Sequence, residues 1–139
     1  MIAANRYVNA HNDMYALSDR QADFQQNKAF NGVELVHETH RLALMNAYLH
    51  NMNANITLGD SLAQSAKGLK DFDVILTNPP FGTKKGGERA TRDDISFQTS
   101  NKQLNFLQVI YRSLKADGKA RCAVVLPDNV LFAAGDGAS

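Results

Sequence analysis

The chain has 139 residues, a length typical of one domain, and its 44% hydrophobic and 21% charged residues exclude wholesale disorder and a collagen-like structure. The net charge of +1 is not the strongly basic balance of a stand-alone nucleic-acid binder. The single cysteine, Cys122, excludes an internal disulfide and suits a reducing compartment. No apolar run reaches the roughly 18 residues of a membrane span, so we expect a cytoplasmic protein with no membrane partner.

The first half of the chain predicts two helices and two strands. Residues 1–29 contain neither Gly nor Pro and predict a helix that frays near Ser18. A short strand is expected over 30–36. Apolar residues spaced at i, i+3 and i+7 predict a helix over 37–50, and a second short strand follows over 54–59.

The second half predicts two further strands with a helix between them. An apolar run over 72–76 must stop near Asn78, because the two prolines after it cannot donate to a ladder. Residues 82–101 are rich in Gly and charge and read as a long loop. An apolar stripe predicts a helix over 102–115, and the apolar run 120–126 predicts the last strand.

The order of these elements indicates the fold class. Helices that alternate with short apolar strands predict an α/β fold with a mostly parallel sheet flanked by helices. The strands are continuous apolar runs, which predicts burial on both faces. Ligands of such sheets bind at the carboxyl ends of the strands. The side chains expected there are Glu34, Asp60, Asn78 to Phe81, and Asp128.

The run Asn78-Pro79-Pro80-Phe81 carries the most specific chemistry. A nucleobase amine or an amide nitrogen is a poor nucleophile because its lone pair is delocalised. Two acceptors bonded to its N–H groups, here the Asn78 side-chain oxygen and the Pro79 carbonyl, would localise that pair. Phe81 would stack on the planar substrate, and the methyl of S-adenosylmethionine is the natural electrophile. The alternative is a strand-ending turn with Phe81 packed on the core.

Five separated blocks of the sequence resemble a known family. Asn78-Pro-Pro-Phe81 is the pattern of methyltransferases that act on adenine N6. With its surroundings, it is similar to the modification subunit of type I restriction-modification systems. The blocks are NGVELVHETHRLALMNAYLHN, GDSL at 59–62, FDVILTNPPFG, LNFLQVIYRSLKADGKA and AVVLPDNVLF.

The resemblance implies a Rossmann-like core that depends on S-adenosylmethionine. Glu34 matches the acid that binds the ribose hydroxyls of the cofactor, and Asp60 matches the acid that contacts its adenine amine. Asn78 to Phe81, including Pro79 and Pro80, match the catalytic motif. The implied partners are DNA and the specificity and restriction subunits of the same system. A solvated strand-end acid is the alternative for Glu34, and a helix N-cap is the alternative for Asp60.

The pattern departs from that family at its cofactor loop, because no Gly-rich turn precedes Glu34. We therefore expect residues 1–139 to be part of one catalytic domain that lacks this loop and the last strands. Unpaired sheet edges would then favour self-association. Two alternatives stay open: an amino-methyltransferase for RNA guanine or protein glutamine, and a non-catalytic fragment or interaction module.

Three weaker signals complete the sequence. The long loop and the residue after it carry five cations that are either phosphate contacts or a solvated surface: Lys84, Lys85, Arg89, Arg92 and Lys102. The H-E-x-H spacing over 37–40 is not that of a metalloprotease, and no metal site is expected. Cys122 alternates with apolar residues and reads as a small buried side chain.

Overall fold

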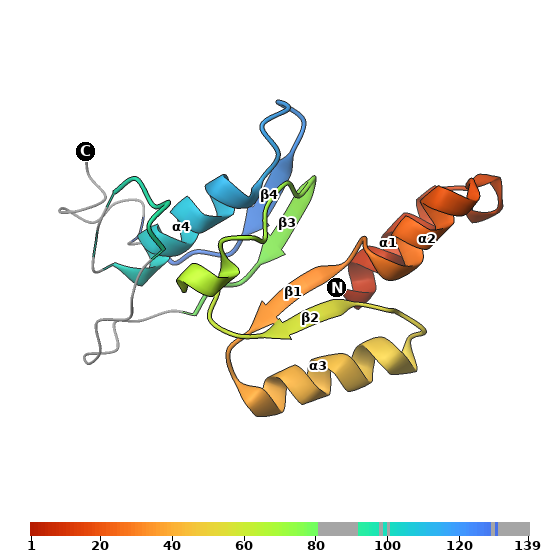
Figure 1. Cartoon of the computed structure of the whole chain (residues 1–139), viewed down its shortest axis with the longest axis horizontal. Helices are drawn as coiled ribbons and strands as arrows, with labels where there is room; N and C mark the ends of the chain where they lie inside the picture. The colour runs from red at the N-terminus through yellow and green to blue at the C-terminus, as the bar shows by residue number, and fades with distance from the viewer. Residues whose placement is uncertain (81–91, 98, 100, 129, 131–139) are drawn as a thin grey trace. The chain divides into compact units, whose positions relative to one another are not determined.

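The computed structural model describes residues 1–80, 92–97, 99, 101–128 and 130 (Figure 1). The chain divides into two compact units, Met1–Asp60 and Ser61–Ser139. Each unit holds a two-stranded parallel sheet in its described part. The α-helices and strands are the ones that the sequence predicts, with one division near the N-terminus; a 3₁₀ helix over Gln64–Ala66 was not predicted.

The first unit pairs two strands beside one helix. Strand β1 runs parallel to β2, in a register that extends from the pair Asn31 and Asn55 to the pair Glu34 and Leu58. Helix α3 packs against both strands (Figure 1), and the Nε2 atom of His40 lies 2.8 Å from the Ile56 carbonyl oxygen. The elements are α1 Ile2–His11, the 3₁₀ helix η1 Met14–Ala16, α2 Asp19–Asn27, β1 Asn31–Glu34, α3 His37–Leu49 and β2 Asn55–Leu58.

The N-terminal helix is two helices rather than one, so the prediction of a single helix over 1–29 was wrong. Side chains between α1 and α2 bond to the backbone and favour a turn over helix continuation. The Asp13 carboxylate accepts a 3.0 Å bond from the Tyr15 N–H. The Ser18 N–H donates at 3.0 Å to the Gln21 side-chain oxygen, which starts α2.

The second unit has the same parallel pairing. Strand β3 pairs with β4, in a register that extends from Val74 and Arg121 to Thr77 and Val124. Helix α4 begins where the Asn101 side chain accepts bonds from two backbone N–H groups of the first turn. The elements are the 3₁₀ helix η2 Gln64–Ala66, β3 Val74–Thr77, α4 Lys102–Ser113 and β4 Arg121–Val124.

Burial is lower than the apolar runs predict. Residues of all four strands are exposed or half-buried, so the expectation of strands buried on both faces was wrong. Each described sheet has only two strands, and this leaves much of its surface uncovered. Cys122 is exposed on β4, which corrects the prediction of a buried thiol. The buried apolar side chains are Ala47, Met52, Ala66, Ile95, Val109, Ile110 and Val130.

None of the helices in the described ranges is long and apolar enough to cross a membrane. Part of the long loop predicted over 82–101 lies outside the described residues, since 81–91, 98 and 100 are not among them. The described residues 92–97 have neither helix nor strand, as predicted.

Candidate functional site

Two of the predicted site residues lie at one edge of the first sheet. Glu34 is the last residue of β1 and stands opposite Leu58, the last residue of β2. The Gly59 N–H donates to the Glu34 carbonyl at 2.9 Å, and Asp60 follows directly. Because the strands are parallel, Glu34 and Asp60 share the carboxyl edge of this sheet, and both are half-buried. This is where an α/β sheet binds its ligands.

The Glu34 carboxylate has a fixed direction. Its Oε1 atom accepts a 2.8 Å bond from the Val36 N–H, at the start of α3. A carboxylate has about four acceptor directions, so this bond leaves capacity for further donors. The arrangement differs from a freely solvated acid and suits an acceptor of ligand hydroxyls.

Asp60 is not a helix cap. The next helix, η2, begins at Gln64 and has Ala63 as its N-cap residue, with no side-chain cap bond. The N-cap alternative for Asp60 was therefore wrong.

The proline motif lies at the corresponding edge of the second sheet. Asn78 follows Thr77 at the end of β3, and the Val125 N–H donates to the Thr77 carbonyl at 3.1 Å, which extends the ladder to the motif. Asp128 follows β4 at the same edge. Asn78 is exposed, whereas Pro79 is buried. A buried ring holds the backbone still beside an amide that a ligand can reach.

These side chains form two groups in two different units. Glu34 and Asp60 belong to Met1–Asp60, and Asn78 and Asp128 belong to Ser61–Ser139. The remaining motif residues divide as well: Pro80 is exposed, and Phe81 lies outside the described residues. Each edge is therefore described from the residues of its own unit.

One of the predicted phosphate contacts has another role. The Arg92 side chain is only 2% exposed and makes two bonds to Asp94, from Nε at 2.8 Å and from Nη2 at 2.6 Å. The bonds from Arg92 hold the pKa of Asp94 below its usual range. A buried, paired guanidinium is neither a phosphate contact nor a solvated side chain, so both alternatives were wrong for Arg92. Lys84, Lys85 and Arg89 lie outside the described residues, and Lys102 is half-buried.

Sequence reasoning missed this pair because both residues stand in a strongly charged stretch. The only signal was the i, i+2 spacing of opposite charges, which is common on solvated loops.

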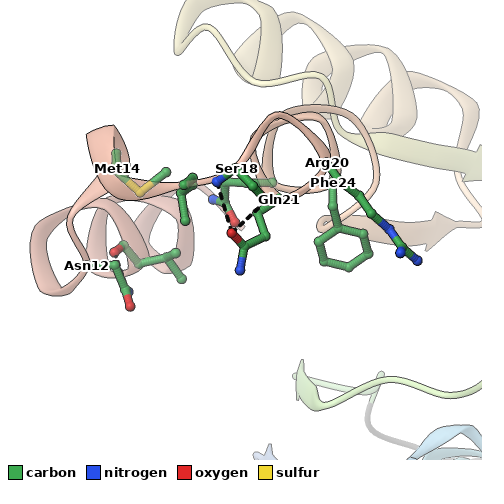
Figure 2. A pocket seen from close by; sticks show the side chains of 9 residues that line it. Asn12, Met14, Ser18, Arg20, Gln21 and Phe24 are labelled. Carbon is green, nitrogen blue, oxygen red and sulfur yellow. Dashed lines mark hydrogen bonds between the residues drawn. The ribbon is translucent and has the colours of Figure 1, made fainter.

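A groove in the first unit holds none of the predicted site residues. It has a volume of about 620 Å³ and is lined by α1, η1 and α2 (Figure 2). Figure 2 shows the bonds of Ser18 to Gln21 at its wall, with Phe24 and Arg20 along the same helix. Its lining holds no Asp or Glu side chain and none of the candidate site residues that the sequence singles out, so we place the candidate site at the sheet edges.

The comparisons with known proteins concern the family of the chain. The family model described as N-6 DNA Methylase matches residues 1–139. The chain belongs to the N-6 DNA methylase family. This confirms the family that the sequence blocks indicate.

Relatives within the N-6 DNA methylase family are methylase subunits of type I restriction enzymes. The chain is 45% identical to the StySPI methylase subunit of Salmonella potsdam, over 99% of the chain and 26% of that protein. It is 44% identical to the EcoKI methylase subunit of Escherichia coli strain K12, with the same coverage. The crystal structure of the EcoKI M protein matches with a TM-score of 0.86 at 43% identity, over 98% of this chain and 29% of that one. The chain thus spans about a quarter of the length of these relatives.

Proposed function

We propose that this chain is a catalytic segment of a modification subunit of a type I restriction-modification system. The reaction would transfer the methyl group of S-adenosylmethionine to adenine N6 in DNA. One observation carries the proposal: an exposed Asn78 beside a buried Pro79 at the carboxyl end of a parallel strand, in an N-6 DNA methylase. The names of the relatives support the type I assignment.

The chemistry follows from the acceptors of the motif. An adenine flipped out of the duplex would present its amine to the Asn78 side-chain oxygen and the Pro79 carbonyl. Both oxygens accept from the amine, localise the nitrogen lone pair and orient it for in-line attack. Phe81 would stack on the base, and Pro80 would restrict the turn between them. The new N–C bond would form as the methyl–sulfur bond breaks, and the proton that the amine loses would pass to solvent.

The first sheet offers acceptors for the cofactor. S-adenosylmethionine supplies the sulfonium methyl group when it is bound. Glu34 would accept from the ribose hydroxyls, because the bond from Val36 fixes its carboxylate while acceptor capacity remains. The half-buried Asp60 at the same edge would accept from the adenine amine. These two residues fit the adenosine part of the cofactor.

The proposed function includes a Rossmann-like fold for the catalytic domain. The two parallel pairs and the match to the EcoKI M protein support a Rossmann-like core in which residues 1–139 are part of one larger catalytic domain. DNA and the specificity and restriction subunits would be the partners, in the cytoplasm.

Substitution of Asn78 in the complete protein tests the proposal. We expect Asn78→Ala to reduce methyl transfer to duplex DNA by roughly 100-fold or more, because an acceptor aimed at the reacting amine is lost. Asn78→Asp keeps acceptor oxygens and should retain part of the activity. Asn46→Ala is the matched control: it makes the same change at an exposed position of α3 in the other unit, and it should leave turnover unchanged.

The substrate panel separates the alternatives. Labelled methyl groups are followed into duplex DNA, RNA and protein, and cofactor binding is measured by calorimetry. Exclusive labelling of RNA or protein would show that the methyl acceptor is a planar nitrogen other than adenine N6. Failure to bind S-adenosylmethionine would favour a non-catalytic module. Unchanged turnover in Asn78→Ala would contradict the catalytic role that we assign to the motif.

A further inference from the structure

The first turn of helix α3 is bonded to strand β2 through a histidine side chain. The Nε2 atom of His40 lies 2.8 Å from the Ile56 carbonyl oxygen. A carbonyl oxygen can only accept, so we assign a proton to Nε2, which donates this bond. Within His37–Leu49, all of which the structure describes, Ala47 alone is buried, and it lies about two turns further on. The start of α3 is therefore held by a directional bond rather than by burial.

The Ile56 carbonyl faces away from β1. The Asn55 N–H donates to the Phe30 carbonyl at 2.9 Å, so the backbone groups of Asn55 face β1. Backbone groups of successive residues in a strand point to opposite sides, so those of Ile56 face the outer edge of β2. Among the described residues, no further strand pairs with β2 on that side. The His40 ring supplies the donor that a neighbouring strand would otherwise provide.

The same turn of α3 orients the Glu34 carboxylate. The His40 N–H donates to the Val36 carbonyl at 2.9 Å, which is the first bond of the helix. The Val36 N–H in turn donates to the Oε1 atom of Glu34 at 2.8 Å. A continuous path of bonds thus runs from β2 through His40 and Val36 to the carboxylate. The direction of this carboxylate depends on where the first turn of α3 lies along β2.

We propose that His40 is a positioning residue for the cofactor. It acts through Glu34, to which we assign the ribose hydroxyls, so this inference rests on the proposed function. Without the ring donor, the first turn of α3 can shift along β2, and the Val36 N–H moves with it. Hydrogen bonds to a carboxylate depend on distance and angle, so a displaced Glu34 would bind the ribose less tightly.

The affinity of the complete protein for S-adenosylmethionine, measured by calorimetry, tests this role. We expect His40→Ala to raise the Kd roughly 5- to 20-fold, because part of a hydrogen bond to a charged group is lost. His40→Phe keeps the ring and removes the donor, so it should raise the Kd to a similar extent. His40→Gln keeps an amide donor and should stay within about threefold of the wild-type Kd. His50→Ala is the matched control: it makes the same change at the exposed C-cap of α3 and should leave the Kd unchanged.

A double-mutant cycle separates positioning from a general loss of stability. Glu34→Gln removes the charged acceptor, and adding His40→Ala to it should raise the Kd less than about twofold further. Turnover of His40→Ala at saturating cofactor should stay within about twofold of wild type, because Asn78 belongs to the other unit. Without cofactor, hydrogen exchange at the start of α3 should be faster in His40→Ala and His40→Phe than in His40→Gln.

Three results would overturn the positioning role. The first is a wild-type Kd in folded His40→Ala and His40→Phe. The second is additivity with Glu34→Gln, which would show that His40 acts independently of Glu34. The third is an equal loss in affinity and in turnover, which would indicate general loosening. The Kd comparison decides the role of His40 even if the wild-type protein methylates no DNA, an outcome that would overturn the proposed function alone.

Discussion

Unequal exposure of the two partners predicts unequal costs when the buried ion pair is broken. The Arg92 side chain is 2% exposed and the Asp94 side chain is 22% exposed. Asp94→Ala leaves a buried guanidinium without its partner, which costs about 3–5 kcal/mol of unfolding free energy. Arg92→Met leaves a carboxylate that reaches water, and Met refills much of the volume, so we expect about 1–3 kcal/mol. The double variant should cost less than Asp94→Ala alone.

Urea denaturation followed by far-UV circular dichroism measures these differences, and it suits a chain with no tryptophan. The four proteins form a double-mutant cycle whose coupling term isolates the pair. The order of costs is the decisive result. If Asp94→Ala were no more destabilising than Arg92→Met, the guanidinium would be reaching water or another partner, and the assignment of Arg92 as a buried residue that depends on Asp94 would be refuted.

Two further predictions concern the start of α4 and the stability of the protein at low pH. Asn101→Ala should lower the free energy of unfolding by about 1 kcal/mol in urea denaturation, because the Asn101 side chain accepts from the Gln103 and Leu104 N–H groups. Asn101→Gly should lower it by only a few tenths of a kcal/mol. Equal losses for the two variants would exclude the cap. Arg92 holds the pKa of Asp94 below its usual range, so the stability it adds is fully present above the unfolded pKa near 3.9 and is lost as the pH falls through the lower folded pKa. The difference in stability between wild type and Asp94→Asn should therefore shrink below about pH 4, and a constant difference would contradict the linkage.

The positions of most helices and strands follow from local patterns. The apolar stripe over 37–50 is α3, and the stripe over 102–115 is α4. The prolines after 72–76 end β3 where a ladder cannot continue. These features depend on residues near one another in the chain, as helical periodicity and the missing N–H of proline do. The parallel pairing was also predictable, because helices alternate with strands.

Most of the errors concern burial, which local patterns do not specify, and one concerns a local choice between two kinds of bond. The break between α1 and α2 depends on whether polar side chains bond to their own backbone or continue a helix. Cys122 stands in an apolar strand, yet the strand is exposed because the described sheet has only two strands. Strand character was readable from composition, whereas burial was not.

The amino-acid sequence by itself determined the family, the order of elements and the Asn78 motif, because these depend on residue identity and spacing. The tertiary structure alone decided which groups share an edge, Glu34 with Asp60 through the β1–β2 register. It also decided that Arg92 is buried and paired with Asp94 rather than a phosphate contact. A charged residue reads as a surface residue in any sequence. Whether it is buried depends on which distant segments fold against it, and here the Arg92 N–H donates to the carbonyl of Leu62, thirty residues earlier in the chain.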